Sequence, residues 1–216
     1  MAIVSTASVQ QVVQALPERS QLVAQGNSWE GGLSTTCGTI TAITGGMPTT
    51  QAQLALYNGE TGASAKSYVI DRVYIMVITS STAGGIGIIT TGVIAPSAIV
   101  GTLATVFGGT AVPNANIKNL AGKGFYGAGN AKLFTNGTIT AVPAIAITDW
   151  VPVQSLPGAG AAATTLGSVV TGECYGRYIL RPGAAIAFNV MGASAAGTNG
   201  IWVSWHEVPS TTLSLV

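Results

Sequence analysis

The sequence predicts an all-β protein, either a β-sandwich or a β-barrel built from antiparallel strands. Segments rich in β-branched residues or with period-two alternation follow one another from Leu33 onward, and turn signals separate most of them. The chain also holds 29 glycines, which suit the tight turns between strands. Many short strands joined by turns are typical of sandwiches and barrels, not of βαβ units. At 216 residues the chain fits one ordinary domain, or one domain with an arm.

Nine segments are predicted to be strands: 35–43, 51–58, 67–79, 86–94, 131–135, 138–147, 166–173, 184–191 and 200–208. Three Asn-Gly dipeptides, at Asn58, Asn136 and Asn199, predict tight hairpin turns because both residues tolerate positive φ angles. No internal repeat is visible.

Period-two alternation assigns faces within the strand at 67–79. One face is predicted to carry Tyr68, Ile70, Arg72, Tyr74 and Met76, and the other Val69, Asp71, Val73, Ile75 and Val77. The adjacent charges Asp71 and Arg72 would then point to opposite sides of the sheet. Each needs a partner on its own face, because an unpaired buried charge is costly.

The first 32 residues differ from the rest and predict an N-terminal arm, followed by a sandwich domain over 33–216. The arm contains VQQVVQAL, which fits a short amphipathic helix. A second short helix is predicted over PSAIVGTLATVF, with Pro96 in its first turn. Residues 108–129 predict a long irregular excursion, and such loops are usually functional or make contacts.

Composition narrows the function. Only 7% of the residues are charged and the net charge is +1, so a basic surface for nucleic acid is not expected. A weakly charged surface suits a protein packed against neighbours.

Residues 86–107 are long enough to span a bilayer, but Pro96, the glycines and the hydroxyl residues argue against a membrane-spanning helix. The N-terminus lacks the basic region of a signal peptide. Cys37 and Cys174 are interpreted as two buried or free thiols, with pairing left open.

No catalytic residue, metal ligand or cofactor site is predicted, and neither is a small-molecule substrate. The single histidine, His206, is interpreted as a strand-end residue near solvent or at a subunit contact, pointing away from Glu207. A hydrolase would require His206 to lie in a cleft beside a carboxylate. A metal shared between subunits at His206 stays open. The tryptophans could bind sugars if exposed, but packing is the favoured interpretation for Trp29, Trp150, Trp202 and Trp205.

The segment YGRYILRPGAAIAFNVMGASAAGTNGIWVSWHEVP resembles the closing strands of jelly-roll domains in virion proteins of tailed bacteriophages. The matching features are the proline turn of YILRPG, the apolar strand AIAFNV, and the final Trp-x-Glu of WHEVP. LALYNGETGASAKSYVIDRVYIMV is similar to the early strands of those modules. The resemblance covers roughly 35–79 and 175–209, and it implies a jelly-roll β-sandwich.

The resemblance also implies a homotrimeric virion component without enzymatic activity. We expect a capsid decoration (cement) protein on the outer surface of a phage head, bound to the major capsid protein. The alternative is a head-fibre or tail-fibre tip that binds a receptor or glycan. Residues of the arm and of the 108–129 excursion are predicted to make the partner contacts: Val9, Val12, Val13, Leu16, Trp29, Lys118, Lys123, Phe125 and Tyr126.

Overall fold

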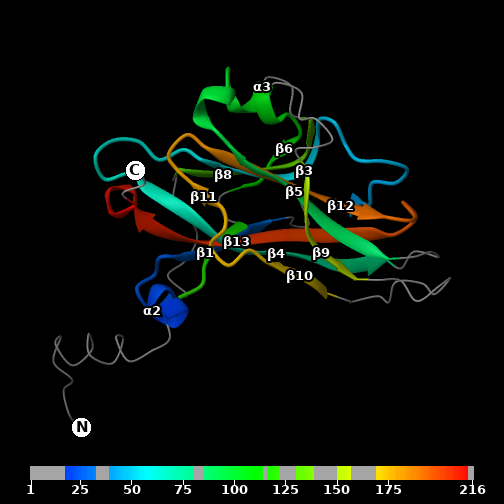
Figure 1. Cartoon of the computed structure of the whole chain (residues 1–216), viewed down its shortest axis with the longest axis horizontal. Coiled ribbons are helices and arrows are strands. Elements are labelled where there is room, and N and C mark those ends of the chain that lie inside the picture. Colours follow the sequence, from blue (N-terminus) through cyan, green and yellow to red (C-terminus); the bar gives the residue numbers. More distant parts are fainter. Residues whose placement is uncertain are drawn as a thin grey trace, which may run out of the picture.

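Two antiparallel β-sheets packed face to face form the body of the molecule (Figure 1). The structure is a computed structural model that describes residues 18–32, 39–79, 85–113, 116–121, 130–138, 150–156 and 169–213. The ladders between the named strands are antiparallel, and buried side chains from both sheets meet between them. The predicted all-β antiparallel sandwich is therefore confirmed.

Sheet A has the strand order β10-β4-β13-β1-β7, with β11 also paired to β4 and β2 to β13. Its centre is the long ladder between β4 and β13, which runs from the pair Lys66–Pro209 to the pair Thr79–Thr198. The strands are β1 (Ser28–Gly32), β2 (Ile40–Thr41), β4 (Lys66–Thr79), β7 (Ile117–Asn119), β10 (Val169–Glu173), β11 (Ile179–Leu180) and β13 (Thr198–Pro209).

Sheet B has the strand order β6-β8-β3-β12-β5-β9. The apolar strand β12 lies between β3 and β5, and nearly all of its side chains are buried. The strands are β3 (Gln51–Asn58), β5 (Ile86–Ile94), β6 (Thr110–Ala111), β8 (Ala131–Thr138), β9 (Val151–Leu156) and β12 (Ala185–Gly192).

The main core fills the space between the sheets. Sheet A contributes Tyr68, Ile70, Val73 and Trp205, all fully buried, and the Tyr68 and Trp205 rings lie 5.9 Å apart. Sheet B contributes β-branched, leucine and aromatic residues that face them: Leu54, Leu56, Ile88, Leu133, Ile186, Phe188 and Val190. Burying this apolar surface is the dominant favourable term in folding, and it fixes which face of each strand points inward.

A second apolar cluster covers the outer face of sheet B. Helix α3 (Leu103–Phe107) lies over this face in Figure 1 and buries Val106 and Phe107 against it. Phe107 stacks on Phe134 of β8, with ring centroids 5.4 Å apart. The predicted helix that begins at Pro96 is instead two pieces, because a 3₁₀ turn, η1 (Pro96–Ala98), is separated from α3 by extended residues. Thr102 caps α3 by accepting a hydrogen bond from the Thr105 N–H.

Two other helical segments flank sheet A. Helix α2 (Glu18–Ala24) precedes β1, and the 3₁₀ turn η4 (Ser210–Thr212) follows β13. The predicted helix at VQQVVQAL lies outside the described residues. No helix of the described part of the chain is long and apolar enough to cross a membrane.

The boundary predicted for the arm needs correction. Residues 28–32 were assigned to the arm, but they form β1, which pairs with β13 on one side and β7 on the other. Gly31 and Gly32 allow this placement, because a Cβ at Gly32 would collide with the backbone of Ile201 and with Trp202. The sandwich therefore includes Ser28–Gly32.

The predicted turns and excursion also differ from the structure. Asn199–Gly200 lies inside β13 and Asn136–Gly137 inside β8, while Asn58 ends β3 with its side chain buried. Neither Gly59 nor Gly200 has a positive φ angle. The described parts of the 108–129 excursion include β6 and β7, which extend sheet B and sheet A respectively. Most of the strand predicted at 138–147 lies outside the described residues.

Candidate functional site

A β-bulge in β4 sets up the candidate site. Arg72 pairs with Ser204 and Ile70 pairs with Trp205, so Asp71 is an extra residue on β4. Both Asp71 and Arg72 therefore lie on the outer face of sheet A, whereas Ile70 is fully buried in the core. The predicted alternation along 67–79 and the opposite orientation of Asp71 and Arg72 are wrong for this reason. The inward face carries Tyr68 and Ile70 before the bulge and Val73, Ile75 and Val77 after it.

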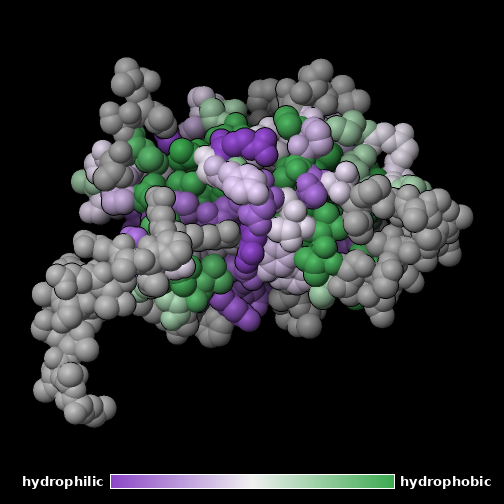
Figure 2. Space-filling view, turned by 60° about the horizontal axis from the view of Figure 1, so that its bottom comes forward, coloured by the Kyte–Doolittle hydropathy of each residue, from purple (hydrophilic) through white to green (hydrophobic). Residues whose placement is uncertain are grey.

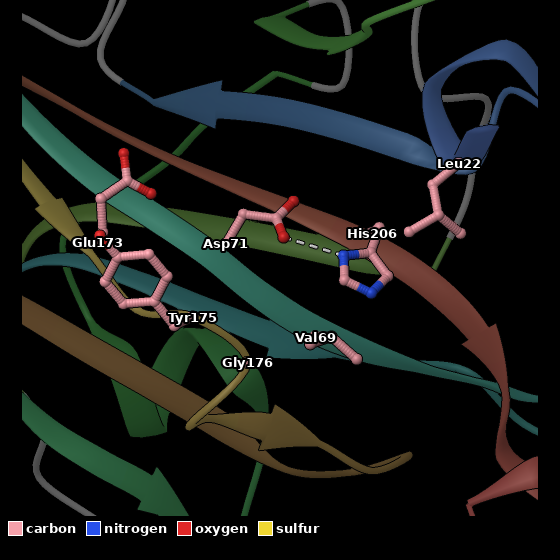
Figure 3. A pocket seen from close by; sticks show the side chains of 7 residues that line it. All are labelled: Leu22, Val69, Asp71, Glu173, Tyr175, Gly176 and His206. Carbon is pink, nitrogen blue, oxygen red and sulfur yellow. Dashed lines mark hydrogen bonds and ion pairs between the residues drawn. The ribbon is translucent and has the colours of Figure 1, made fainter. Parts of the chain in front are cut away.

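The bulge brings Asp71 to His206. The His206 Nδ1 lies 2.9 Å from Asp71 Oδ1, and the two side chains are only 17% and 13% exposed. Figure 3 shows the side chains pointing toward one another, with the second ring nitrogen of His206, Nε2, directed away from Asp71. A carboxylate at Nδ1 orients an imidazole and selects the tautomer that leaves Nε2 free to accept a hydrogen bond.

A tight turn between β10 and β11 stands beside this pair. The Cys174 N–H donates to the Asp71 carbonyl, and the Arg177 N–H donates to the Cys174 carbonyl, which closes the turn around Tyr175 and Gly176. Tyr175 has a φ of 48°, the only non-glycine residue with a positive φ in the described part of the chain. Its side chain is 83% exposed. An aromatic residue in the left-handed region is uncommon, and such strain clusters at functional sites.

These elements line an open pocket of about 450 Å³ on the outer side of sheet A. Figure 3 shows Leu22 of α2 and Tyr175 of the turn on opposite sides of the Asp71–His206 pair. The lining residues are Leu22, Val69, Asp71, Glu173, Tyr175, Gly176 and His206. The pocket thus combines apolar walls, one aromatic ring, two carboxylates and an imidazole. Pockets with this mixture are typical of small-ligand sites.

The position of His206 meets one condition for a hydrolase, because it lies in a pocket beside a carboxylate. The described residues that line the pocket include no serine, threonine or cysteine that could act as a nucleophile with it. The prediction that His206 and Glu207 point apart is confirmed. Glu207 is buried on the other face of β13, where Lys66 Nζ lies 2.6 Å from its Oε2.

Next to the pocket, the outer face of sheet A carries stacked aromatic and charged side chains. Trp202 stacks on Tyr74 with ring centroids 5.5 Å apart, and the Arg72 guanidinium lies over the Tyr74 ring. Arg72 is 3.9 Å from Glu30 of β1. Burial raises the pKa of Tyr74 well above its usual value, and a hydrogen bond to the Glu30 carboxylate adds to the shift. Figure 2 shows a hydrophilic band across this side of the molecule, with hydrophobic areas on both sides.

The predicted partner-contact residues fall into three groups. Lys118 is exposed on β7, at the edge of sheet A. Trp29 is half-buried, packs against the core and pairs with Trp205, which fits the packing interpretation, and its role as a contact residue stays a prediction. The other predicted residues lie outside the described part of the chain: Val9, Val12, Val13, Leu16, Lys123, Phe125 and Tyr126. Trp150 and Trp205 are also buried, as predicted.

Cys174 lies directly behind the pocket turn and is a free, fully buried thiol. Burial raises its pKa to about 11, which keeps it protonated at neutral pH. Cys37 lies outside the described residues. Among the described residues there is no group of three or more histidine, cysteine, aspartate or glutamate side chains that could hold a metal ion.

Sequence reasoning missed Asp71, Glu173 and Tyr175 as site residues. The Gly176 that follows Tyr175 was an available turn signal.

The comparisons with known proteins found no relative: no family model, no curated protein and no solved structure matches this chain.

Proposed function

We propose that this protein is a structural virion component that decorates the outer surface of a phage head as a homotrimer. It would stabilise contacts between neighbouring major capsid proteins without catalysing a reaction. The observation that carries the proposal is the strand order of the two sheets, taken together with the resemblance of the chain's early and closing strands to phage jelly-roll modules.

The strand order supports a jelly-roll connectivity. Strands β1, β13, β4 and β10 lie side by side in sheet A, and β3, β12, β5 and β9 lie side by side in sheet B. The chain crosses between the sheets repeatedly, so that early strands pair with late ones: β1 with β13, and β3 with β12. An eight-stranded, double-sheet arrangement of this kind is what two Greek keys produce, and viral capsid domains use it.

The surface and the arm fit an attachment role. Only 7% of the residues are charged, and apolar side chains such as Met76 and Val169 are exposed next to one another on sheet A. Helix α2 is three residues away from β1, so the predicted arm is joined directly to a strand of sheet A. An arm and a body that bind at separate points raise avidity without tighter individual contacts. Apolar area buried at such contacts contributes about 25 cal/mol per Å².

The first test is the solution mass, measured by light scattering after size exclusion. A trimer has three times the chain mass of 21.6 kDa, and this result is expected. The trimer should then bind empty capsids of a tailed phage and raise their heat resistance. Deleting residues 1–17, which spares α2 and β1, should weaken that binding, whereas Val93→Ala on β5 should not. A monomer that leaves capsids unbound contradicts the proposal.

A second candidate is the fibre tip that binds a receptor or glycan. It predicts exposed aromatic side chains on the sandwich, away from the arm. Tyr175 meets the first condition, because it is the most exposed large hydrophobic residue described. It does not meet the second, because Leu22 of α2 lines the same pocket. Binding of the purified protein to host cells that lack capsids would favour this candidate.

A further inference from the structure

We infer that the pocket of Asp71, Glu173, Tyr175 and His206 binds a neutral saccharide, with one hexose ring of a glycan as the bound unit. This inference goes beyond the proposed capsid role and does not depend on it, because it rests on the chemistry of one pocket within a single chain.

The aromatic side of the pocket suits a sugar ring. Tyr175 presents its side chain almost fully to solvent, and Val69 and Leu22 give the pocket apolar surface. A pyranose has one face of C–H groups that packs on an aromatic ring, and its hydroxyl groups point outward from the edge. The tyrosine side chain can pack its ring on the C–H face of a sugar and use its hydroxyl group for a hydrogen bond. The Tyr175 side chain is 83% exposed, so its ring is accessible to a ligand, while backbone hydrogen bonds hold the turn that presents it.

The polar side of the pocket suits hydroxyl groups. Ionised Asp71 and Glu173 only accept hydrogen bonds, whereas each sugar hydroxyl can donate one. His206 adds an imidazole to these carboxylates. Its Nδ1 lies 2.9 Å from Asp71, and its Nε2 points away from Asp71. The bulge fixes the position of Asp71, and its carbonyl is tied to the Cys174 N–H. Asp71 and His206 are therefore held in place before a ligand arrives, which lowers the entropy lost on binding.

Charge and size restrict the class of saccharide. The described lining residues include two carboxylates and neither lysine nor arginine, which disfavours phosphorylated, sulfated or sialylated sugars. The pocket volume of about 450 Å³ falls within the range of roughly 300–1,000 Å³ that is typical of small-ligand sites. A terminal or penultimate neutral hexose fits both limits.

The test is saturation-transfer difference NMR on the full chain, with glucose, galactose, N-acetylglucosamine and rhamnose as probes. Sialyllactose serves as the anionic probe and choline as the cationic one. We expect at least one neutral sugar to bind with a Kd of about 1 mM, and sialyllactose to bind at least about tenfold more weakly. No response from any neutral sugar overturns the inference. Choline binding without sugar binding overturns it as well, because the carboxylates would then select a cation.

Variants separate a binding role of Tyr175 from a structural one. Tyr175→Gly removes the ring and relieves the positive φ, so the melting temperature should stay level or rise while sugar affinity falls at least about tenfold. Tyr175→Phe should keep affinity within about twofold, and Asp71→Ala should lose about tenfold. Val93→Ala, exposed on the other sheet, is the matched control and should change neither quantity. Full sugar affinity in Tyr175→Gly would refute the assignment.

Discussion

The side chains of Gln53 and Asn189 each accept a backbone N–H of the opposite strand, just beyond the point where the β3–β12 ladder ends. The Gln53 N–H donates to Asn189 Oδ1 at 2.9 Å, and the Val190 N–H donates to Gln53 Oε1 at 2.6 Å. Each side-chain amide also donates one hydrogen bond, from Gln53 Nε2 to the Thr41 carbonyl and from Asn189 Nδ2 to the Gln51 carbonyl. Two buried side chains thus replace ladder bonds that the strands themselves do not make.

Replacing Asn189 with leucine should therefore destabilise the fold strongly. The substitution leaves the buried Gln53 N–H without its acceptor and the Gln51 carbonyl without its donor. Each unsatisfied buried group costs about 1–3 kcal/mol, so the loss of both partners should lower the free energy of unfolding by about 2–6 kcal/mol. Urea denaturation followed by tryptophan fluorescence measures it. Gln51→Ala removes only an exposed side chain and should change stability by no more than about 0.5 kcal/mol. Equal effects of the two variants would show that the hydrogen bonds of the Asn189 side chain do not contribute to the free energy of unfolding.

Among glycine-to-alanine substitutions, Gly32→Ala should reduce the stability of the fold the most. A Cβ at this position meets the backbone carbonyl of Ile201, which cannot move without disturbing the β1–β13 ladder. Forced overpacking of this kind costs about 1–3 kcal/mol. Gly46→Ala is the control, since open space surrounds Gly46 and its φ is not positive. A melting temperature of Gly32→Ala equal to that of Gly46→Ala would contradict the packing described for β1.

The Cys174 thiol makes stability depend on pH in the alkaline range. Its folded pKa of about 11 lies above the ordinary value of 9.0, so the folded state holds the proton longer than the unfolded state. The resulting stability is fully present below about pH 9 and is lost progressively between pH 9 and 11, by on the order of 2 kcal/mol.

The measurement uses a Cys37→Ser background, so that Cys174 is the only thiol. Thiol alkylation at pH 8 should be slow in buffer and fast in denaturant, because the thiolate is the reactive form. Cys174→Ala in the same background should abolish the part of the stability loss between pH 9 and 11 that the thiol causes. Rapid alkylation of the folded protein would contradict the burial of Cys174.

Local sequence patterns predicted several strands well. The predicted ranges 51–58 and 86–94 coincide with β3 and β5, because β-branched and apolar residues set these strands within a few neighbours. Features that depend on distant partners were not predictable in the same way. Residues 28–32 look like a linker in sequence, and only pairing with β13 and β7 makes them a strand. Asn136–Gly137 and Asn199–Gly200 failed as turn signals for the same reason, since both lie within ladders to neighbouring strands, whereas Asn58 does mark the end of β3.

The candidate site exists because the β-bulge at Asp71 shifts the register of β4 against β13 by one residue. Asp71 and His206 are 135 positions apart, and alternation alone placed Asp71 and Arg72 on opposite faces. The extra residue in β4 is defined only against β13, so the sequence of β4 does not reveal the bulge. Tyr175 is likewise ordinary in sequence, and its significance comes from its backbone conformation and exposure. The tertiary pairing of strands, not local propensity, assembled the pocket.

The position of β1 between two neighbours has a mechanical consequence. A tension applied through α2 along the axis of β1 loads its hydrogen bonds to β13 and β7 in parallel, so the bonds share the force and do not break one after another. Strands held at a sheet edge and pulled sideways unzip at much lower force. Pulling β1 out of sheet A would therefore require shearing two ladders at once, so β1 resists extension along its axis more strongly than an edge strand does.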